Sequence, residues 1–258
     1  MSSPLTRTLR DVLPVLVLAI FVLFGWTFAA SWWELPKSLL PTPLECARAA
    51  WMYRQDLIGG FVGTGIAAVA GLSVAFVAGL LMSIVFEWFP WLRKAAFPYV
   101  MLLQTVPIVA IAPLLIIWSG YTFRTVALVT TVVCLFPIIN AASAGLRRVE
   151  PEMSDLFDLY HVNKWRRLIR LQMPASIRDL VVGLKTAAGL SVIGAIVAEF
   201  FVGNGTRYDG LGTLMSGWQA MAQTDALIAA IVASTLLGLL LFGLINLLTR
   251  TLLSRWVK

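Results

Sequence analysis

The chain has 258 residues, of which 59% are hydrophobic and 13% are charged, and its formal net charge is +7. This charged share is about half of that in soluble proteins, so the composition excludes a soluble globular domain. A membrane-spanning helix needs roughly 20 residues, which leaves room for five or six spans with short connections. The bases lie at the ends of apolar runs rather than on one folded face, and this distribution argues against nucleic-acid binding.

The first apolar run covers residues 12–30 and follows Arg7 and Arg10. It is longer than the apolar core of a signal peptide, and Trp32 follows it where an interfacial aromatic belt is expected. We therefore predict a retained first span whose N-terminus is cytoplasmic. Residues 34–56 contain three prolines and then a short amphipathic pattern, so we assign residues 1–56 to this span plus an extracytoplasmic amphipathic segment.

Residues 57–258 form the predicted core domain of five further spans. Their apolar runs cover residues 57–86, 97–119, 125–145, 180–202 and 226–248. The fold class that follows is an all-α polytopic membrane protein with six transmembrane helices and both termini on one side.

The distribution of basic residues predicts the orientation of these spans. Five of the 20 Lys and Arg residues fall on the side opposite the N-terminus: Lys37, Arg48, Arg54, Arg124 and Arg207. The other fifteen fall on the N-terminal side, which the positive-inside rule assigns to the cytoplasm. Residues 147–178, a long polar segment between two spans, are then cytoplasmic.

This polar segment carries an amphipathic pattern. One apolar stripe at helical spacing consists of Met153, Leu156, Phe157 and Tyr160. Asn163 is the expected N-cap of a second short helix, and Pro174 is expected to end that helix. We predict two short amphipathic helices on the membrane surface, joined by a tight turn. The residues alone leave open whether the segment merely joins two spans.

The segment resembles the cytoplasmic coupling loop of ABC importer permeases. That motif reads Glu-Ala-Ala, three residues, Gly, and after a longer gap Pro. Asp155 stands at the Glu position, Leu156 and Phe157 replace the two Ala residues, His161 replaces the Gly, and Pro174 matches the Pro. The flanking stretches AGLRRVEP and MPASIRDLVVGLKTAAGLSVIGAIVAEFFVG resemble the nitrate, sulfonate and taurine-type permeases, and especially importers of thiamine-precursor pyrimidines or riboflavin.

The resemblance implies the type I ABC importer permease fold in a bacterial inner membrane. Two copies of the chain are expected to form the pathway, with two ATPase subunits on the cytoplasmic loops and an extracytoplasmic solute-binding protein. The implied solute is a pyrimidine vitamin precursor or riboflavin, or else a sulfonate or nitrate. The residues expected to couple to the ATPase are Met153, Asp155, Leu156, Phe157, Tyr160, His161 and Pro174.

The chain is not expected to be an enzyme, because the sequence contains no G-x-x-x-x-G-K-[ST] phosphate-binding loop. ATP is therefore hydrolysed by another chain, and no cofactor is expected. His161, the single histidine, gives no metal site, and Cys46 and Cys134 lie on different predicted elements without metal-ligand spacing.

The candidate pathway residues are polar or helix-breaking positions inside the spans. The third run contains Pro107 and Pro113, which remove backbone donors, and Gln104 and Thr105 are placed to bond the freed carbonyls or to line a path. The remaining candidates lie in the next two runs and are Asn140, Ser191 and Glu199.

Glu199 is the one carboxyl group inside an otherwise apolar span. Such a group at mid-bilayer costs about 2.5–3.5 kcal/mol on insertion scales, so it indicates a functional site unless it lies hydrated near the outer interface. An acidic residue also occurs here in the resembling family, which favours a gate or helix-contact role over proton relay. An ion-coupled secondary transporter is the alternative function, but it needs ionisable residues facing one another, and usually internal repeats.

Overall fold

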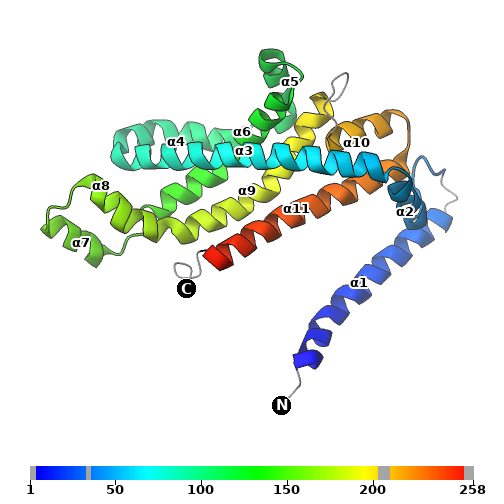
Figure 1. Cartoon of the computed structure of the whole chain (residues 1–258), viewed down its shortest axis with the longest axis horizontal. Helices are drawn as coiled ribbons and strands as arrows, with labels where there is room; N and C mark the ends of the chain where they lie inside the picture. The colour runs from blue at the N-terminus through cyan, green and yellow to red at the C-terminus, as the bar shows by residue number, and fades with distance from the viewer. Residues whose placement is uncertain (1–3, 33–35, 203–209, 253–258) are drawn as a thin grey trace.

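The computed structural model describes residues 4–32, 36–202 and 210–252, and within them all regular secondary structure is helical. Arg207, which the topology argument used, lies outside these residues. The helices are α1 (Pro4–Trp32), α2 (Pro43–Met52), α3 (Arg54–Trp88), α4 (Pro90–Thr105), α5 (Ile108–Ser119), α6 (Phe123–Gly145), α7 (Pro151–Leu159), α8 (Lys164–Arg167), the π-helical segment η1 (Leu168–Gln172), α9 (Met173–Val202), α10 (Leu211–Ala220) and α11 (Thr224–Leu252). Helices α7 and α8 lie at one end of the long axis, and α2 and α10 lie at the other (Figure 1).

Within the described residues, four helical stretches are long and apolar enough to cross a membrane: α3, α6, Lys164–Val202 and α11. Helices α4 and α5 together make a fifth candidate, although the pair is bent by 103°. The all-helical membrane fold is thus confirmed. The predicted first span, residues 12–30, stays a prediction, since the apolar part of α1 within the described residues is the shorter Val17–Trp32.

The core of the bundle is formed by α3, α6 and α9, which pack closely because small residues lie between them. A Cβ atom at Gly71 of α3 would come within 2.5 Å of the Thr130 side chain of α6. Gly183 of α9 lies in the same way against Ala141 of α6. Where lipid supplies no hydrophobic drive between helices, such close backbone approach provides the packing contacts that hold spans together.

The third apolar run is not the single helix that the sequence predicts. Val106 and Pro107 are extended, with ψ of 125° and 123°, and α5 begins after Pro107 at a sharp angle to α4. The reason is local, since proline disfavours the helical conformation of the residue before it and supplies no amide hydrogen. Pro113 has no such effect and lies within α5.

Pro174 does not end the helix that begins at Lys164, so that part of the prediction is wrong. The chain continues without a break from Lys164 through η1 into α9, over 39 residues. The wider π-helical turn directly before Pro174 explains this outcome, because it changes the hydrogen-bond register at the point where a proline would otherwise remove a bond and clash with the preceding turn. Asn163 is the predicted N-cap, because its side chain accepts a bond of 2.8 Å from the Arg166 amide.

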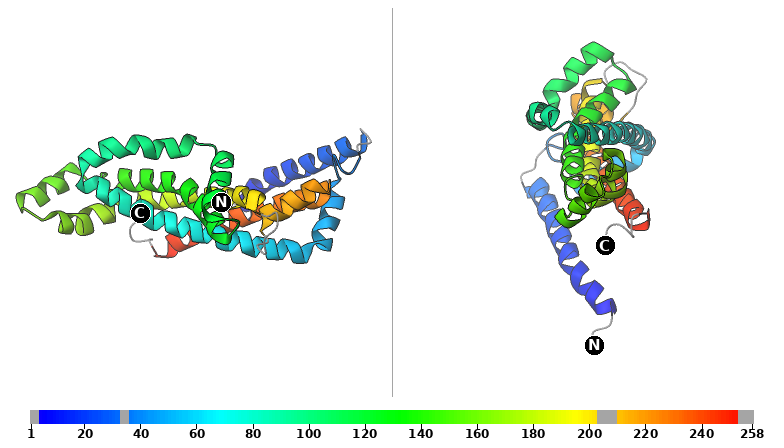
Figure 2. Two further views of the ribbon diagram at one scale, coloured as in Figure 1. Left: turned by 90° about the horizontal axis from the view of Figure 1, so that it is seen from above. Right: turned by 90° about the vertical axis from the view of Figure 1, so that its left-hand side faces the viewer.

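Helix α1 leaves the bundle near α2 and runs away from the other helices (Figures 1 and 2). The Trp26 indole donates a hydrogen bond of 3.0 Å to the Pro41 carbonyl at the foot of the helix. Toward the N-terminus of α1, the side chains of Phe21 and Phe24 are 72% and 69% exposed in the single chain. A surface of this kind needs lipid or another protein against it.

Candidate functional site

Helices α7 and α8 form one unit at their end of the bundle. The Arg167 guanidinium reaches back from α8 and bonds to the Asp158 carboxylate and the Ser154 hydroxyl of α7, each at 2.5 Å. The turn between the helices passes through His161, whose φ is +48°. This left-handed conformation suits glycine, the residue at that position of the resembling motif, and is disfavoured for other L-residues.

The predicted apolar stripe of α7 is largely exposed. Met153 and Leu156 are 42% and 44% exposed, and Tyr160, which caps the helix, is 72% exposed. Phe157 is the exception in the stripe, since it is half-buried against the rest of the chain. Leu159, at 75%, is a member of the exposed surface that the sequence argument missed, although its spacing of three from Leu156 could have shown it. We call Met153, Leu156, Leu159 and Tyr160 the α7 surface.

This unit is fixed to the spans through α3 and η1. The Trp165 ring of α8 packs on the Trp88 ring of α3, with centroids 5.7 Å apart. The buried Gln172 amide donates a hydrogen bond of 2.8 Å to the Glu87 carboxyl group. The α7 surface is therefore held at a defined position relative to the bundle. Asp155 and His161 lie exposed on the same unit, whereas Pro174 belongs to α9.

Glu199 lies at the opposite end of α9 and is fully buried. Its Oε2 atom accepts a hydrogen bond of 2.8 Å from the Thr64 hydroxyl of α3 and another of 2.9 Å from the Gly212 amide in the first turn of α10. The Thr64 hydroxyl in turn accepts a bond of 2.8 Å from the Leu211 amide. One carboxyl group thus joins three helices and supplies acceptors for the N-terminus of α10.

The close approach of α10 to Glu199 depends on two glycines. A Cβ atom at Gly210 would overlap the Glu199 carboxyl group, and one at Gly212 would overlap the Ile196 carbonyl and the Glu199 side chain. The sequence left open that Glu199 is hydrated near the outer interface, but in the structure its side chain is fully buried in the single chain. What sequence reasoning missed is Thr64, because nothing in its neighbourhood along the chain indicates a partner 135 residues away.

The other pathway candidates are dispersed. Gln104 lines a hollow of about 260 Å³ beside the α4–α5 break, where α6 and α9 supply the remaining walls. Thr105 is exposed and its hydroxyl donates to the Leu102 carbonyl. Asn140 is exposed on α6, and Ser191 is buried and bonds to the Ala188 carbonyl of its own helix. Thr186, which lines the same hollow as Gln104, was not among the candidates.

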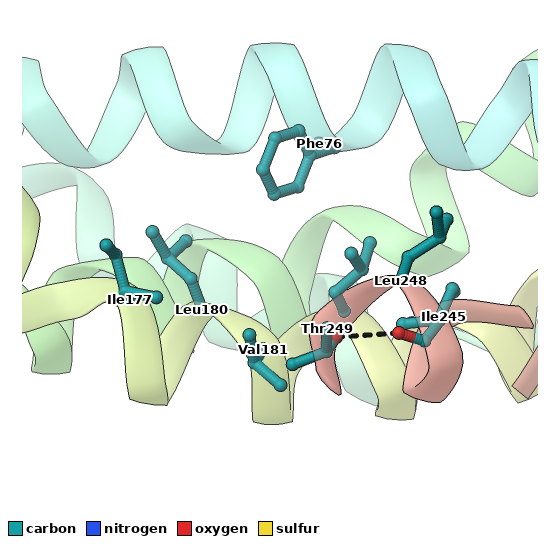
Figure 3. Close-up of a pocket in the computed structure, with 8 residues that line it drawn as sticks. Phe76, Ile177, Leu180, Val181, Ile245, Leu248 and Thr249 are labelled. Atoms are coloured by element: carbon teal, nitrogen blue, oxygen red, sulfur yellow. Dashed lines mark hydrogen bonds between the residues drawn. The ribbon is translucent and has the colours of Figure 1, made fainter. Parts of the chain in front are cut away.

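A second hollow, of about 300 Å³, lies between α3, α9 and α11 (Figure 3). Phe76 of α3 points toward Val181 and Leu180 of α9 and toward Ile245 of α11. Among the described residues that line this hollow, Thr249 carries the one polar side chain, and its hydroxyl donates a hydrogen bond of 2.6 Å to the Ile245 carbonyl. The described lining of this hollow therefore offers mainly apolar contact.

Comparison with known proteins decides the family. The family described as "Binding-protein-dependent transport system inner membrane component" matches residues 71–254, which is well over half of the chain. The chain belongs to this family. It is therefore an ABC importer permease, which is a multi-pass membrane protein and a transport component.

Three similar permeases cover most of the chain. A protein of Haemophilus influenzae named "Probable ABC transporter permease protein" is 26% identical over 91% of this chain and 94% of its own length. The formylaminopyrimidine transport permease protein ThiX of Halalkalibacterium halodurans is 29% identical over 85% and 86%. The riboflavin transport system permease protein RibX of Chloroflexus aurantiacus is 28% identical over 98% and 95%.

Membership of this permease family gives the two sites a common setting. Permeases of ABC importers work with ATPase and substrate-binding partners, and the resemblance seen in the sequence is thereby confirmed. The matched residues 71–254 contain both the α7 surface and Glu199, so neither site belongs to an appended segment.

Proposed function

We propose that this chain is the permease subunit of an ATP-driven importer and that the α7 surface is where its ATPase binds. The observation that carries this proposal is an exposed apolar surface on a helix whose position is fixed by the Trp165–Trp88 and Gln172–Glu87 contacts. A surface helix without a partner does not require such firm anchoring. A helix that transmits the movement of a partner to α9 does require it, because a loose helix would absorb the movement.

The spacing of the α7 surface fits a partner groove. An amphipathic helix presents anchors at intervals of three and four residues, as Met153, Leu156 and Tyr160 do. Burying one such side chain contributes roughly 1.5–3 kcal/mol, so losing it weakens binding about tenfold or more. Asp155, exposed beside these anchors, is expected to pair with a base of the ATPase and to fix orientation more than affinity.

The test is the substitution Leu156→Asp in the full-length chain. We expect the variant to insert in the membrane but to lose its ATPase on purification, together with ATP-driven uptake. Leu156→Met, which keeps volume and polarity, is the matched control and should retain both. Phe157→Asp is a poorer test because Phe157 is half-buried within the chain. If the Leu156→Asp variant still binds a stoichiometric, active ATPase, the α7 surface is not the coupling element.

The remaining partners follow from the family and from exposed apolar surface. We propose that two copies form the pathway as a homodimer with Gln104, Thr105, Pro107 and Asn140 near it, and that a solute-binding protein docks at the α10 end. The α7 end, the N-terminus and the C-terminus are assigned to the cytoplasm of a bacterial inner membrane, on the count of basic residues. A cysteine introduced in place of Lys37 should react with an impermeant maleimide in intact cells, and one in place of Arg167 should not.

The solute is proposed to be a pyrimidine vitamin precursor or riboflavin, with sulfonate or nitrate as the alternative. Support comes from the names of ThiX and RibX. The competing function is ion-coupled transport through Glu199. Its hydrogen bonds to Thr64 and Gly212 favour a helix-contact role instead. Uptake that requires a proton gradient and continues in ATP-depleted cells would establish the competing function.

A further inference from the structure

Lys185 of α9 is a basic residue within a candidate membrane span, and its hydrogen-bond partner is uncharged. The Lys185 ammonium group donates a hydrogen bond of 2.8 Å to the Asn246 side chain of α11. A charged group inside a span is costly and marks a functional contact by default. Among the described residues, the basic side chains in ion pairs are those of Lys37, Arg148 and Arg167. No described carboxylate therefore forms an ion pair with Lys185.

Two arginines lie near the same contact between α9 and α11. Residues seven apart share a helix face, so Arg178 lies on the face of α9 that carries Lys185, about two turns nearer the start of the helix. Residues four apart also share a face, so Arg250 lies on the face of α11 that carries Asn246. The bond between Lys185 and Asn246 shows that these two faces meet. Helix α9 begins and α11 ends on the side toward α7, so both arginines lie on that side of the bond (Figure 1).

We call Arg178, Lys185 and Arg250 the basic seam, and its charge is not balanced by ion pairs within the described residues. Both arginines are exposed. Asp179 follows Arg178 in the sequence, but its carboxylate forms an ion pair of 3.0 Å with Arg148 instead. The remaining sequence after Arg250 contains no Asp or Glu. Like charges on facing helices repel one another, and an anion placed among them removes this repulsion.

The hollow between α3, α9 and α11 runs beside the basic seam (Figure 3). Each base directly follows a residue that lines this hollow, namely Ile177, Leu184 or Thr249. Leu248 also lines the hollow and is 54% exposed, so the hollow opens at the surface of the chain. A free phosphate ion would use the bases and leave this apolar space unused. A phospholipid uses both, because its headgroup carries a phosphate and its acyl chains are apolar.

We propose that the basic seam and this hollow bind one anionic phospholipid, with its phosphate between Arg178 and Arg250 and one acyl chain in the hollow. Basic pockets between spans are a recurring type of site for anionic lipid headgroups. An apolar helix of a second copy would fill the hollow but leave the three bases without an anion, so charge favours the lipid. The site involves neither the ATPase nor the solute, and it therefore goes beyond the proposed function.

The test is fluorescence quenching in the full-length chain, labelled with bimane at Leu244→Cys and reconstituted in phosphatidylcholine liposomes. Leu244 is 47% exposed and lies one turn from Leu248 at the rim of the hollow. The native Cys46 and Cys134 are buried, so the label should attach to the introduced thiol. The liposomes contain rising fractions of phosphatidylglycerol, which is anionic, or of phosphatidylcholine, which has no net charge, each with bromine atoms on its acyl chains as the quencher.

We expect the quenching curves to give phosphatidylglycerol an affinity higher by about fivefold or more, since one base near a membrane surface contributes about that much. Replacing both exposed arginines, as Arg178→Gln with Arg250→Gln, should make the two affinities nearly equal. A second apolar groove between α3 and α11 provides the matched control, because no described residue in its lining is ionisable. Bimane at Leu240→Cys in this groove should be quenched equally by both lipids.

Equal quenching by the two lipids at Leu244 overturns the proposal, and so does a preference that survives the loss of both arginines. A preference of the same size at Leu240 overturns it as well, because that result would reflect the whole membrane surface rather than this site. Quenching by neither lipid at Leu244 would mean that protein, such as a second copy of the chain, covers the hollow, and it overturns the proposal too.

Discussion

The two ends of α9 treat polar and apolar side chains in opposite ways. At the α10 end, the Glu199 carboxyl group is buried and its partners come from α3 and α10 of the same chain. At the α7 end, the acidic residues of α7, Glu152, Asp155 and Asp158, are exposed, and so are Leu156 and Tyr160. One end pairs its buried polar group within the chain, and the other exposes apolar side chains.

Under the proposed function, the α10 end holds residues that constrain folding and the α7 end holds residues that constrain binding. Burying a carboxyl group without matching donors is costly, so the α10 end is specified by close contacts, including two glycines. The α7 end needs only a rigid attachment to the bundle, and the contacts to Trp88 and Glu87 of α3 provide it. Substitutions should therefore affect stability at one end and association at the other.

The largest effect on stability is expected from Glu199→Leu. It removes the acceptor for the Gly212 amide and the Thr64 hydroxyl, and each buried group left unsatisfied costs about 1–3 kcal/mol. The midpoint of SDS-induced unfolding should fall sharply. Glu199→Gln keeps an acceptor oxygen and should lose much less. Equal midpoints for the Leu variant and the wild type would mean that α10 does not depend on this carboxyl group.

Two glycines of α10 provide an independent check of the same contact. A methyl group at Gly212 would overlap the Ile196 carbonyl, whereas one at Gly217 would meet nothing within 4 Å. Gly212→Ala should therefore destabilise by about 1–3 kcal/mol through overpacking. Gly217→Ala, in the same helix, should be neutral or stabilising by up to about 1 kcal/mol. Similar unfolding midpoints for the two variants would contradict the packing described.

How much of each end could be predicted from the sequence depends on how far apart in the chain the interacting residues lie. The helix unit at the α7 end was predictable because its signals are local. Asn163 lies three residues from the amide it caps, and the stripe repeats within one short helix. Local spacing also predicted that Phe157 belongs to the stripe, but not that it is half-buried, since that depends on packing against the rest of the chain.

The α10 end and the pathway could not be assembled in this way. The bond between Thr64 and Glu199 crosses 135 residues, and Thr64 has no local feature that separates it from other threonines in spans. The third apolar run was predicted as one helix, because apolar composition indicates that a segment is buried in the membrane but not whether its helix axis bends. The observed 103° bend comes from Pro107, while Pro113 in the same run causes no break.

A smaller effect is expected from Gln172→Leu, which tests whether the α7 end is anchored. The change leaves the Glu87 carboxyl group without this donor, at a cost of about 1–3 kcal/mol. We expect faster tryptic cleavage at Lys164 and Arg166, with little change in the SDS midpoint. Lys164 is exposed and suits this assay. Unchanged cleavage would show that the Trp165–Trp88 contact alone holds the unit.

His161→Gly should act in the opposite direction. His161 has a φ of +48°, and a left-handed conformation costs an L-residue roughly 1–2 kcal/mol. Glycine removes that cost but adds about 0.5–1 kcal/mol of unfolded-state entropy, so the net stabilisation is small. Tryptic cleavage at Lys164 should slow slightly, and His161→Val should accelerate it. Faster cleavage in the glycine variant would show that the histidine side chain stabilises the turn.

The smallest effect concerns Glu45, a second carboxyl group that caps a helix at the α10 end. Unlike Glu199 it is partly exposed, at 22%, and it forms a capping box with Thr42 and an ion pair of 2.7 Å with Lys37. The Lys37 bond and then the Thr42 amide lower the pKa of Glu45 from 4.5 to about 2. A depressed folded-state pKa means that the stabilisation is complete above pH 4.5 and is lost as the pH falls toward 2.

Glu45→Gln therefore separates an exposed helix cap from the buried one. The wild type should unfold at a slightly higher temperature than the variant at about pH 6, and this difference should shrink as the pH falls from 4.5 toward 2. The effect is small because solvent screens a partly exposed ion pair. The same comparison for Glu199→Gln should show a larger difference near neutral pH, because that side chain is fully buried and its hydrogen bonds join three helices. If Glu45→Gln lowers the unfolding temperature near neutral pH as much as Glu199→Gln does, burial of the carboxyl group is not what stabilises the contacts at the α10 end.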